Sequence, residues 1–136
     1  MTFKTITIED HARLLPFWKE NYFVNELDAC EPFHIFLEKN PNLSLLIEKN
    51  GEIIGSALGS FDGRRGYIQK LVISKEYRKQ GIGKQLVDKM IKKLRAVGAL
   101  YIPINPEECV VPFYKKCGFT TSDSIPMKIS YSTYKK

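Results

Sequence analysis

Cysteine and histidine are scarce in this chain of 136 residues, which has three cysteines and two histidines. The cysteines are odd in number and show no C-x-x-C spacing, which excludes a disulfide framework and leaves no zinc-binding pattern. No apolar run approaches the ~20 residues that a membrane-spanning helix needs. Residues 1–6 read as an amphipathic strand, without the apolar segment of a signal peptide. We therefore expect a cytoplasmic protein with no metal ion and no membrane partner.

Acidic residues are in short supply in the second half of the chain. Residues 1–60 hold 5 Lys/Arg and 9 Asp/Glu, a net charge of 5 − 9 = −4, and residues 61–136 hold 16 and 6, a net charge of 16 − 6 = +10. A basic half suits a ligand with several phosphates, and an acidic half suits a cationic acceptor. Solvated helix faces explain much of the positive charge equally well. Nucleic acid is a poorer explanation, because no recognition motif or stacking-aromatic pattern accompanies the lysines.

No repeat, linker or low-complexity tract divides the chain, and its 43% hydrophobic content is ordinary, so we expect a single domain over residues 1–136. Alternating apolar residues predict strands, and apolar residues at helical spacing predict helices. Asn50-Gly51 is a strong hairpin signal at the centre of an antiparallel meander. The expected strands are 2–8, 43–48, 52–61, 66–73, 99–104 and 125–131. The expected helices are 10–22, 32–40, 82–97 and 106–118, the last one capped by Asn105.

The most informative segment runs from Arg78 to Lys84 and reads RKQGIGK. It follows an apolar run over residues 68–73 and opens an amphipathic helix. Free backbone N–H groups and the positive end of a helix dipole meet at such a start, and glycine lets an anion approach the backbone closely. The spacing does not fit a P-loop, because Arg78 stands at its first glycine and Gln85 at its hydroxyl. Nor does it fit the dinucleotide fingerprint G-x-G-x-x-G, because Leu86 stands at the third glycine. A phosphate-bearing cofactor is still indicated.

Two motifs carry a family resemblance. Arg78, Gly81 and Gly83 fit the pattern R/Q-x-x-G-x-G/A, and Tyr77 precedes them. Further along the chain, residues 113–119 read FYKKCGF and fit F-Y-x-x-x-G-F. In this order, on a chain of this length, the two segments resemble the pyrophosphate-binding motif and the last helix of the GNAT acetyltransferase superfamily.

The resemblance implies an α/β fold, with a mixed, mostly antiparallel twisted sheet of six to seven strands flanked by about four helices. Its central parallel strands, 66–73 and 99–104 in this chain, splay apart in the family and admit the pantetheine arm of the cofactor. A crossover helix between two strands also dictates that they run parallel. Pro103 within the second strand cannot donate a ladder hydrogen bond, so local loss of pairing is expected.

The resemblance also implies an acetyl-CoA-dependent N-acetyltransferase, an acyltransferase that moves an acetyl group to a primary amine by direct attack in a ternary complex. Backbone N–H groups of the glycine turn would bind the pyrophosphate, and the strand before it would bind pantetheine through its backbone. Glu107 stands where the family has an asparagine, and Asn105 lies two residues earlier. The expected cofactor-binding residues are Leu71, Val72, Ile73, Arg78, Lys79, Gln80, Gly81, Ile82, Gly83, Lys84 and Asn105.

Expulsion of coenzyme A as a thiolate calls for a proton, which a phenol can supply. Tyr114 matches the family's general-acid tyrosine, on a helix that Pro112 is expected to interrupt. The attacking amine must first lose a proton, and Tyr67 stands where one branch of the family has a glutamate base. The alternatives that remain are an ordered water chain, the substrate's own pre-equilibrium, and the carboxylates of Glu31, Asp28 and Glu26.

The sequence does not identify the acceptor substrate. By resemblance, residues 10–40 shape its pocket, and they offer aromatic side chains beside carboxylates, a combination that suits a cation. The same aromatics read equally well as core. The aromatic candidates are Trp18, Tyr22, Phe23, Phe33 and Phe36. A non-catalytic acyl-CoA-binding or regulatory module of the same fold is the alternative to an enzyme, and a homodimer is compatible with either.

Overall fold

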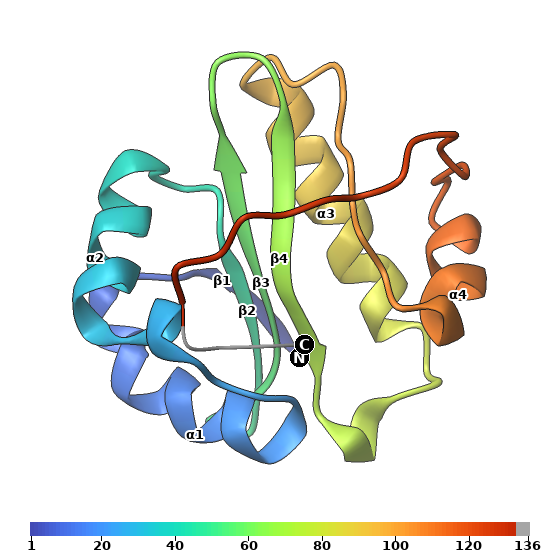
Figure 1. Cartoon of the computed structure of the whole chain (residues 1–136). Helices are drawn as coiled ribbons and strands as arrows, with labels where there is room; N and C mark the ends of the chain where they lie inside the picture. The colour runs from blue at the N-terminus through green and yellow to red at the C-terminus, as the bar shows by residue number, and fades with distance from the viewer. Residues whose placement is uncertain (133–136) are drawn as a thin grey trace.

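Four antiparallel strands form a single sheet in the computed structural model, which describes residues 1–132 (Figure 1). In hydrogen-bonded order, the strands are β1 (Thr2–Thr5), β2 (Leu45–Lys49), β3 (Glu52–Phe61) and β4 (Gly66–Ile73). The α-helices are α1 (His11–Asn21), α2 (Cys30–Lys39), α3 (Ile82–Ala96) and α4 (Val111–Lys116). Short 3-10 helices join them: η1 (Ile8–Asp10), η2 (Glu26–Asp28), η3 (Lys75–Tyr77) and η4 (Glu108–Val110). The α/β class and the four helices are confirmed.

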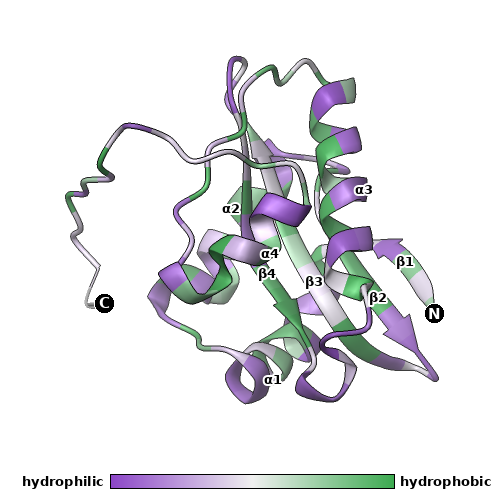
Figure 2. Cartoon of the chain, turned by 90° about the vertical axis from the view of Figure 1, so that its right-hand side faces the viewer, coloured by the Kyte–Doolittle hydropathy of each residue, from purple (hydrophilic) through white to green (hydrophobic). Residues whose placement is uncertain are grey.

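Two hydrophobic layers hold the helices on the sheet, one on each face. Helices α1 and α2 pack on one face and α3 packs on the other, with its apolar side turned toward the strands (Figures 1 and 2). The first layer consists of Ile6, Leu14, Phe17, Trp18, Phe33, Leu46, Leu58 and Val72. The second consists of Leu45, Ile47, Ile54, Ala57, Ile82, Leu86 and Met90. Leu45 and Leu46 are neighbours in β2 and belong to opposite layers, as strand alternation requires.

A β-bulge interrupts β4 shortly before it reaches the predicted cofactor turn. Between the pairs Ser56–Val72 and Leu58–Gln69, β4 contains one residue more than β3. Lys70 lies in this bulge with a left-handed φ of 51°. An extra residue reverses the alternation of side chains along a strand. The bulge therefore sets which β4 side chains face α3 and which face α1.

Only four of the six to seven expected strands are present within residues 1–132. The predicted strand 99–104 contributes one isolated parallel bridge, between Arg65 and Tyr101. Gly66 N donates a hydrogen bond to Tyr101 O at 3.0 Å. Pro103 has no N–H with which to continue the ladder, which explains why pairing stops there. The two segments diverge beyond this point, as expected, but the second of them is not a strand.

The predicted strand 125–131 is also wrong. Its residues are irregular in structure, and no strand within residues 1–132 pairs with them. A strand exists only where a neighbour accepts its backbone hydrogen bonds. The alternation of apolar residues was correctly recognised in this segment, but a partner inside the same chain was wrongly assumed.

The last helix begins later than predicted. Asn105 is not its cap, because η4 starts after Glu107 and α4 starts after Val110. A proline clashes with the carbonyl four residues before it and is accepted only in the first turn of a helix. Pro112 occupies that first turn in α4. It therefore delays the start of the helix and does not interrupt the part that carries Tyr114.

Replacement of Gly59 by alanine tests the closeness of packing between β3 and α3. A Cβ at Gly59 would overlap the carbonyl oxygen of Leu43 and come within 2.8 Å of Met90 Cε. We expect Gly59→Ala to lower the free energy of unfolding in urea titrations by about 3 kcal/mol or more, because a buried backbone cannot move aside freely. Gly63→Ala is the control, since Gly63 has a φ of +95° and open space around it. Its cost should be only the left-handed strain of about 1 to 2 kcal/mol; equal losses would contradict the packing.

Candidate active site

The turn between β4 and α3 is bent through two left-handed residues, Lys79 with a φ of 64° and Gly81 with a φ of 82°. Gly81 is the N-cap of α3, and no side chain hydrogen-bonds across this cap. A Cβ built on Gly81 would find nothing within 4 Å. The surface at the helix start is therefore open to a ligand, and only a residue without a Cβ adopts this backbone without strain.

The backbone donors at the start of α3 lack partners within residues 1–132. No group of residues 1–132 accepts a hydrogen bond from the N–H groups of residues 79–84. The helix is 15 residues long, so its aligned peptide dipoles place partial positive charge at the same end. Unpaired N–H groups and this charge together favour an anion with several oxygens.

Arg78 attaches the turn to neighbouring backbone through two hydrogen bonds. Its Nε donates to the carbonyl of Ile73 at 2.9 Å, and one of its terminal nitrogens donates to the carbonyl of Asn21 at 2.8 Å. Asn21 also accepts a hydrogen bond from the N–H of Lys75 at 3.0 Å. Two guanidinium donors are thus used to join the turn to the end of α1. The phosphate contact predicted for this arginine stays a prediction, and the bonds that it makes within the chain attach the turn to the end of α1.

Two further basic or polar side chains of the turn also bind within the chain. Gln80 Nε2 donates to the carbonyl of Glu76 at 3.2 Å. Lys84 forms an exposed ion pair with Asp88, with Nζ and Oδ2 2.9 Å apart. The hydrogen bond to Asp88 raises the pKa of Lys84, so this lysine carries a positive charge beside the helix start.

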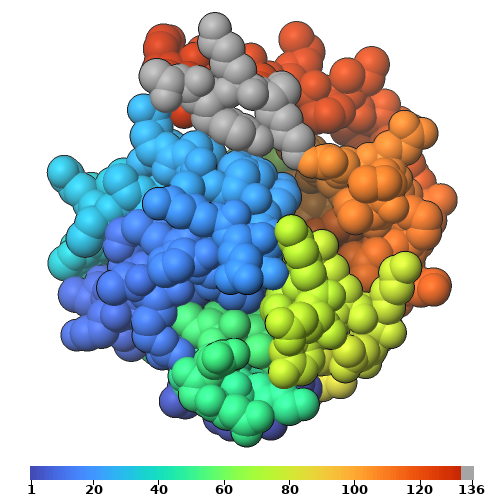
Figure 3. All heavy atoms as spheres, turned by 90° about the horizontal axis from the view of Figure 1, so that it is seen from below, coloured from blue at the N-terminus to red at the C-terminus, as the bar shows by residue number. Residues whose placement is uncertain are grey.

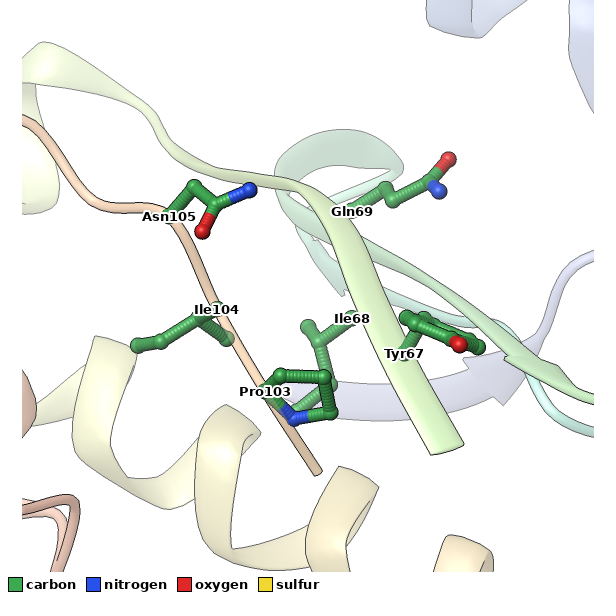
Figure 4. A pocket seen from close by; sticks show the side chains of 6 residues that line it. All are labelled: Tyr67, Ile68, Gln69, Pro103, Ile104 and Asn105. Carbon is green, nitrogen blue, oxygen red and sulfur yellow. The ribbon is translucent and has the colours of Figure 1, made fainter. Parts of the chain in front are cut away.

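The outer edge of β4 borders a small cavity. Beyond the bridge at Tyr101, the segment 103–105 leaves β4, and a cavity of about 290 Å³ lies between them. Figure 4 shows the amide of Asn105 directed toward β4 across this gap. The residues that line the cavity are Tyr67, Ile68, Gln69, Pro103, Ile104 and Asn105. The notch between these segments is where the splayed strands were expected to admit a ligand.

The three β4 residues expected to contact the cofactor differ in where their side chains lie. Leu71 and Ile73 pack on the α3 layer, and Val72 is buried in the α1 layer. Their strand is bonded to β3 along one edge, and the other edge is open beyond Gly66. Backbone groups of this edge are therefore what the strand offers to a ligand, whatever its side chains are.

Tyr114 projects from α4 into a groove next to the notch. Its ring packs edge-on against Phe113 and Phe119, with centroids 5.1 and 5.6 Å away. Burial raises its pKa, and the nearby Cys117 and Tyr22 raise it further, so the phenol keeps its proton. The groove has a volume of about 1220 Å³ and is lined by the chain from Leu100 to Pro106 on one side and from Val111 to Pro126 on the other.

Several of the predicted site residues come together at this place. Asn105 lines both the notch and the groove that contains Tyr114. Gly83 permits α4 to approach α3, because a Cβ there would lie 3.2 Å from the ring of Phe113. Seen from below, the surface is hollowed where α1, the turn after β4 and the segment before α4 meet (Figure 3). The helix start, the strand edge and the tyrosine therefore share one face of the molecule.

Lys70 is a residue of this region that the sequence reading missed. Its ammonium group forms an ion pair with Asp28 Oδ2 at 2.8 Å and donates to the carbonyl of Phe23 at 2.7 Å. It also lies 4.3 to 5.5 Å from the ring centroids of Phe23, Trp18 and Tyr22. Three of the five aromatic candidates, together with Asp28, therefore already surround an internal cation. A lysine within the apolar run 68–73 was the available signal.

Contacts within the chain also engage Asp28 and Tyr67, two residues considered for the removal of the amine proton. Asp28 is committed, because its carboxylate also accepts a hydrogen bond from Asn25 N at 3.0 Å. Tyr67, at the expected position of a glutamate base, donates its hydroxyl proton to Asp62 at 3.3 Å. Burial raises the pKa of the Cys117 thiol, which makes it a poor nucleophile near Tyr114.

Two kinds of feature are absent from the part of the chain that the structure describes. Residues 1–132 hold no group of three or more His, Cys, Asp or Glu side chains placed to bind a metal ion. Over the same residues, no helix has both the length and the apolar character to cross a bilayer. Separate from these absences, the structure offers the donors at the start of α3 and the edge of β4. Both suit a ligand that carries phosphates and amides.

Known relatives define the class of protein to which an antiparallel sheet with these helices and this glycine turn belongs. The sequence profile of the acetyltransferase (GNAT) family matches residues 9–119. An acetyltransferase of Yersinia pestis (strain Pestoides F) is 32% identical over 125 residues, which cover 90% of this chain and 83% of the relative. An acetyltransferase of Pectobacterium atrosepticum is 36% identical over 94 residues, 67% of each chain. The chain belongs to the GNAT family of acetyltransferases.

Solved structures share the fold at low sequence identity. Glucosamine-6-phosphate N-acetyltransferase from Arabidopsis thaliana superimposes with a TM-score of 0.72 at 21% identity, covering 96% of this chain and 99% of that one. An aminoglycoside antibiotic 6'-N-acetyltransferase from Acinetobacter haemolyticus has a TM-score of 0.74 at 12% identity, covering 96% and 98%. The ribosomal-protein-S18-alanine N-acetyltransferase of Escherichia coli has a TM-score of 0.73 at 15% identity, covering 89% and 78%. At such low identities the similarity shows a shared fold and nothing more.

Removal of the Lys70 ammonium tests the internal ion pair. We expect Lys70→Met to lower the free energy of unfolding by about 3 to 5 kcal/mol, because Asp28 is left as a buried charge without its partner. Adding Asp28→Asn to that variant should recover part of the loss. Lys89→Met is the control, since this exposed lysine lies 4.7 Å from the Phe3 ring centroid and should contribute about 1 kcal/mol or less. Equal effects of the two lysine variants in urea titrations would contradict the assignment.

Proposed function

We propose that this chain is an acetyl-CoA-dependent N-acetyltransferase that moves an acetyl group to a primary amine by direct attack in a ternary complex. The observation that carries the proposal is the set of unpaired N–H groups at residues 79–84, next to the open edge of β4. The first feature suits a pyrophosphate, and the second suits an arm that contains amides. Coenzyme A has both in one molecule, whereas a nucleotide alone would use only the first.

In this proposal the backbone does most of the cofactor binding. N–H groups of residues 79–84 bind the pyrophosphate, and Lys79 and Lys84 add positive charge nearby. The edge at residues 71–73 binds pantetheine as an added strand would, and one of its N–H groups polarises the thioester oxygen. Asn105 reaches across the notch and hydrogen-bonds the same arm. Acetyl-CoA, when bound there, supplies an activated acyl thioester.

Tyr114 is the proposed general acid. Its hydroxyl proton passes to the sulfur that leaves when the amine attacks the acyl carbon, and the proton that the nitrogen loses as the amide forms restores the phenol. A thiol has an ordinary pKa near ~8.5 and a phenol near ~10, so transfer from the phenol to the thiolate costs only roughly 2 kcal/mol. Burial raises the pKa of Tyr114 above that ordinary value, which keeps the proton available across the working pH range.

The attacking amine loses its proton before the transfer. A lysine-like amine has a pKa of ~10.4, so deprotonation near pH 7 costs roughly 4 to 5 kcal/mol. Asp28 is held by Lys70 and is not free to remove that proton. We assign the deprotonation to exchange with water before attack, with Glu26 and Glu31 as the carboxylates that stay open as bases, and kcat/KM should rise with pH toward the pKa of the amine.

An amine screen tests the proposed function, with release of free thiol from acetyl-CoA as the readout. The structural neighbours act, by their names, on a sugar phosphate, an aminoglycoside and a protein alanine, so the panel contains glucosamine 6-phosphate, aminoglycosides and alanine-initiated peptides. We expect at least one amine to accelerate thiol release above the rate without amine. Binding of acetyl-CoA without amine-dependent release would favour a non-catalytic module, and absence of binding would refute both.

Replacement of Tyr114 by phenylalanine tests the acid within that screen. We expect kcat to fall by about 100-fold or more, with KM for acetyl-CoA little changed, because the hydroxyl acts only as the sulfur leaves. Tyr101→Phe is the matched control, since it removes an exposed hydroxyl from the same groove. Wild-type activity should not decline from loss of the Tyr114 proton until the pH exceeds the usual phenol range. An unchanged kcat in Tyr114→Phe would remove this residue from the mechanism.

Alanine at Gly81 tests the anion site separately from the chemistry. We expect Gly81→Ala to weaken coenzyme A binding, measured by calorimetry, on the order of 10-fold, because a Cβ would occupy the surface where phosphates approach. Gly51→Ala is a matched control, because Gly51 has a φ of +80° and open surroundings, as Gly81 does with +82°. Both variants should lose similar stability. Equal coenzyme A affinity in the two variants would show that the turn does not bind phosphates.

A further inference from the structure

Two asparagines at the ends of helices are buried and form hydrogen bonds in the same way. Asn21 ends α1 and Asn40 follows α2, and they are 8 and 9% exposed. The Nδ2 of each donates to the carbonyl four residues earlier, at 3.0 and 3.1 Å. The Oδ1 of each accepts a backbone N–H from a distant segment, Lys75 N at 3.0 Å and Phe61 N at 2.9 Å respectively. Each amide therefore fixes a helix end against another part of the fold, with its buried polar atoms satisfied.

The two asparagines differ in the segment that they hold. Asn40 is bonded to Phe61, which ends β3 and pairs with Gly66, at the end of β4 that lies away from the glycine turn. Asn21 is bonded to Lys75, the first residue of η3, which leads directly into that turn. Of the two asparagines, it is therefore Asn21 that attaches its helix to the predicted cofactor site.

Both ends of η3 are bonded to Asn21. Its side chain accepts from Lys75 N at the start of η3, and its main-chain carbonyl accepts from the Arg78 guanidinium at 2.8 Å just after the end. The sheet provides a further attachment before η3, a hydrogen bond from Ser74 N to Ile54 O at 2.8 Å. Figure 3 shows the end of α1 next to the turn after β4. One residue of α1 thus holds the segment that precedes the glycine turn.

The direction of the backbone donors depends on how that segment is held. Lys79 and Gly81 have left-handed backbones, so the N–H groups of residues 79–84 point where η3 and the start of α3 direct them. Hydrogen bonds to an anion tolerate only a narrow range of length and angle. A site that is displaced by about 1 Å therefore loses much of its affinity, which is why binding groups need support from the residues behind them.

We propose that Asn21 is a positioning residue for coenzyme A, which aims the N–H groups of residues 79–84 at the pyrophosphate by holding Lys75 and Arg78. The inference rests on the proposed function, because the ligand is the one assigned there. Asn21 acts without touching that ligand, since its amide is buried and both of its polar atoms are bonded within the chain.

Calorimetric titration with coenzyme A tests this role in two matched variants. Asn21→Ala and Asn40→Ala remove equivalent hydrogen bonds at similar burial, so their melting temperatures should fall by similar amounts. We expect the dissociation constant for coenzyme A to rise on the order of 10-fold in Asn21→Ala, the effect of about one lost hydrogen bond. It should keep the parent value in Asn40→Ala. Equal affinities in the two variants would overturn the inference and leave the proposed function standing, whereas a parent chain that does not bind coenzyme A would refute both.

Asn21→Asp separates positioning from stability. Its carboxylate keeps an oxygen that accepts from Lys75 N, but it has no donor for the carbonyl of Phe17, and its charge opposes the dipole at the C-terminal end of α1. We expect a lowered melting temperature together with a coenzyme A affinity close to that of the parent. Affinity that follows stability across the variants would make Asn21 a purely structural residue, and the proposal would be wrong.

Amide chemical shifts give a readout that needs no ligand. In proton–nitrogen correlation spectra of the free chain, the resonances of residues 79–84 should move in Asn21→Ala and stay in place in Asn40→Ala. If Asn21→Ala does not fold, Asn21→Ser and Asn40→Ser replace the alanine pair in both measurements, because a serine hydroxyl is too short to reach the same partners. Resonances that stay in place in the Asn21 variant would show that the turn keeps its orientation without this amide, which would overturn the inference.

Discussion

The hydrogen bond from Gly66 N to Tyr101 O is the last backbone bond that residues 1–132 form on the outer edge of β4, and the shape of the site depends on it. Beyond this point residues 103–105 separate from β4, because Pro103 has no N–H to donate to that strand. Had the pairing continued, the backbone groups of residues 71–73 would be occupied. They would then be unable to bind the amides of a ligand. The notch, the position of Asn105 and the groove beside Tyr114 all follow from that separation.

A second constraint is the bulge in β4, which sets the side of the strand that faces α1. The bulge in β4 turns Lys70 toward α1, where Asp28 and three aromatic rings surround its ammonium group. Such a pair is stabilising only when both partners are present, so it ties the loop after α1 to the strand that borders the notch. Arg78 joins the same end of α1 to the cofactor turn. The two cations therefore hold α1, the loop after it, β4 and the glycine turn in one arrangement.

Local signals in the sequence predicted a large part of this molecule. Asn50 and Gly51 both adopt positive φ in the hairpin between β2 and β3, as their residue types require. The glycine turn and the start of α3 were placed correctly, because turn chemistry and helix periodicity act over a few residues. The start of the last helix was placed too early, since Asn105 and Pro106 gave a competing signal and Pro112 decided the outcome. The aromatic residues of α1 were identified, but the cation they surround was not.

The sequence by itself determined the family, the order of helices and strands up to α3, and the place of the glycine turn that opens α3, because each depends on contiguous residues. Only the tertiary structure decided that Arg78 binds carbonyls, that Lys70 fills the aromatic cluster, and that 99–104 and 125–131 are not strands. These features depend on partners far apart in the chain, since a buried charge or a strand is defined by what lies beside it. The spacing of residues within one segment does not reveal which other segment lies beside it.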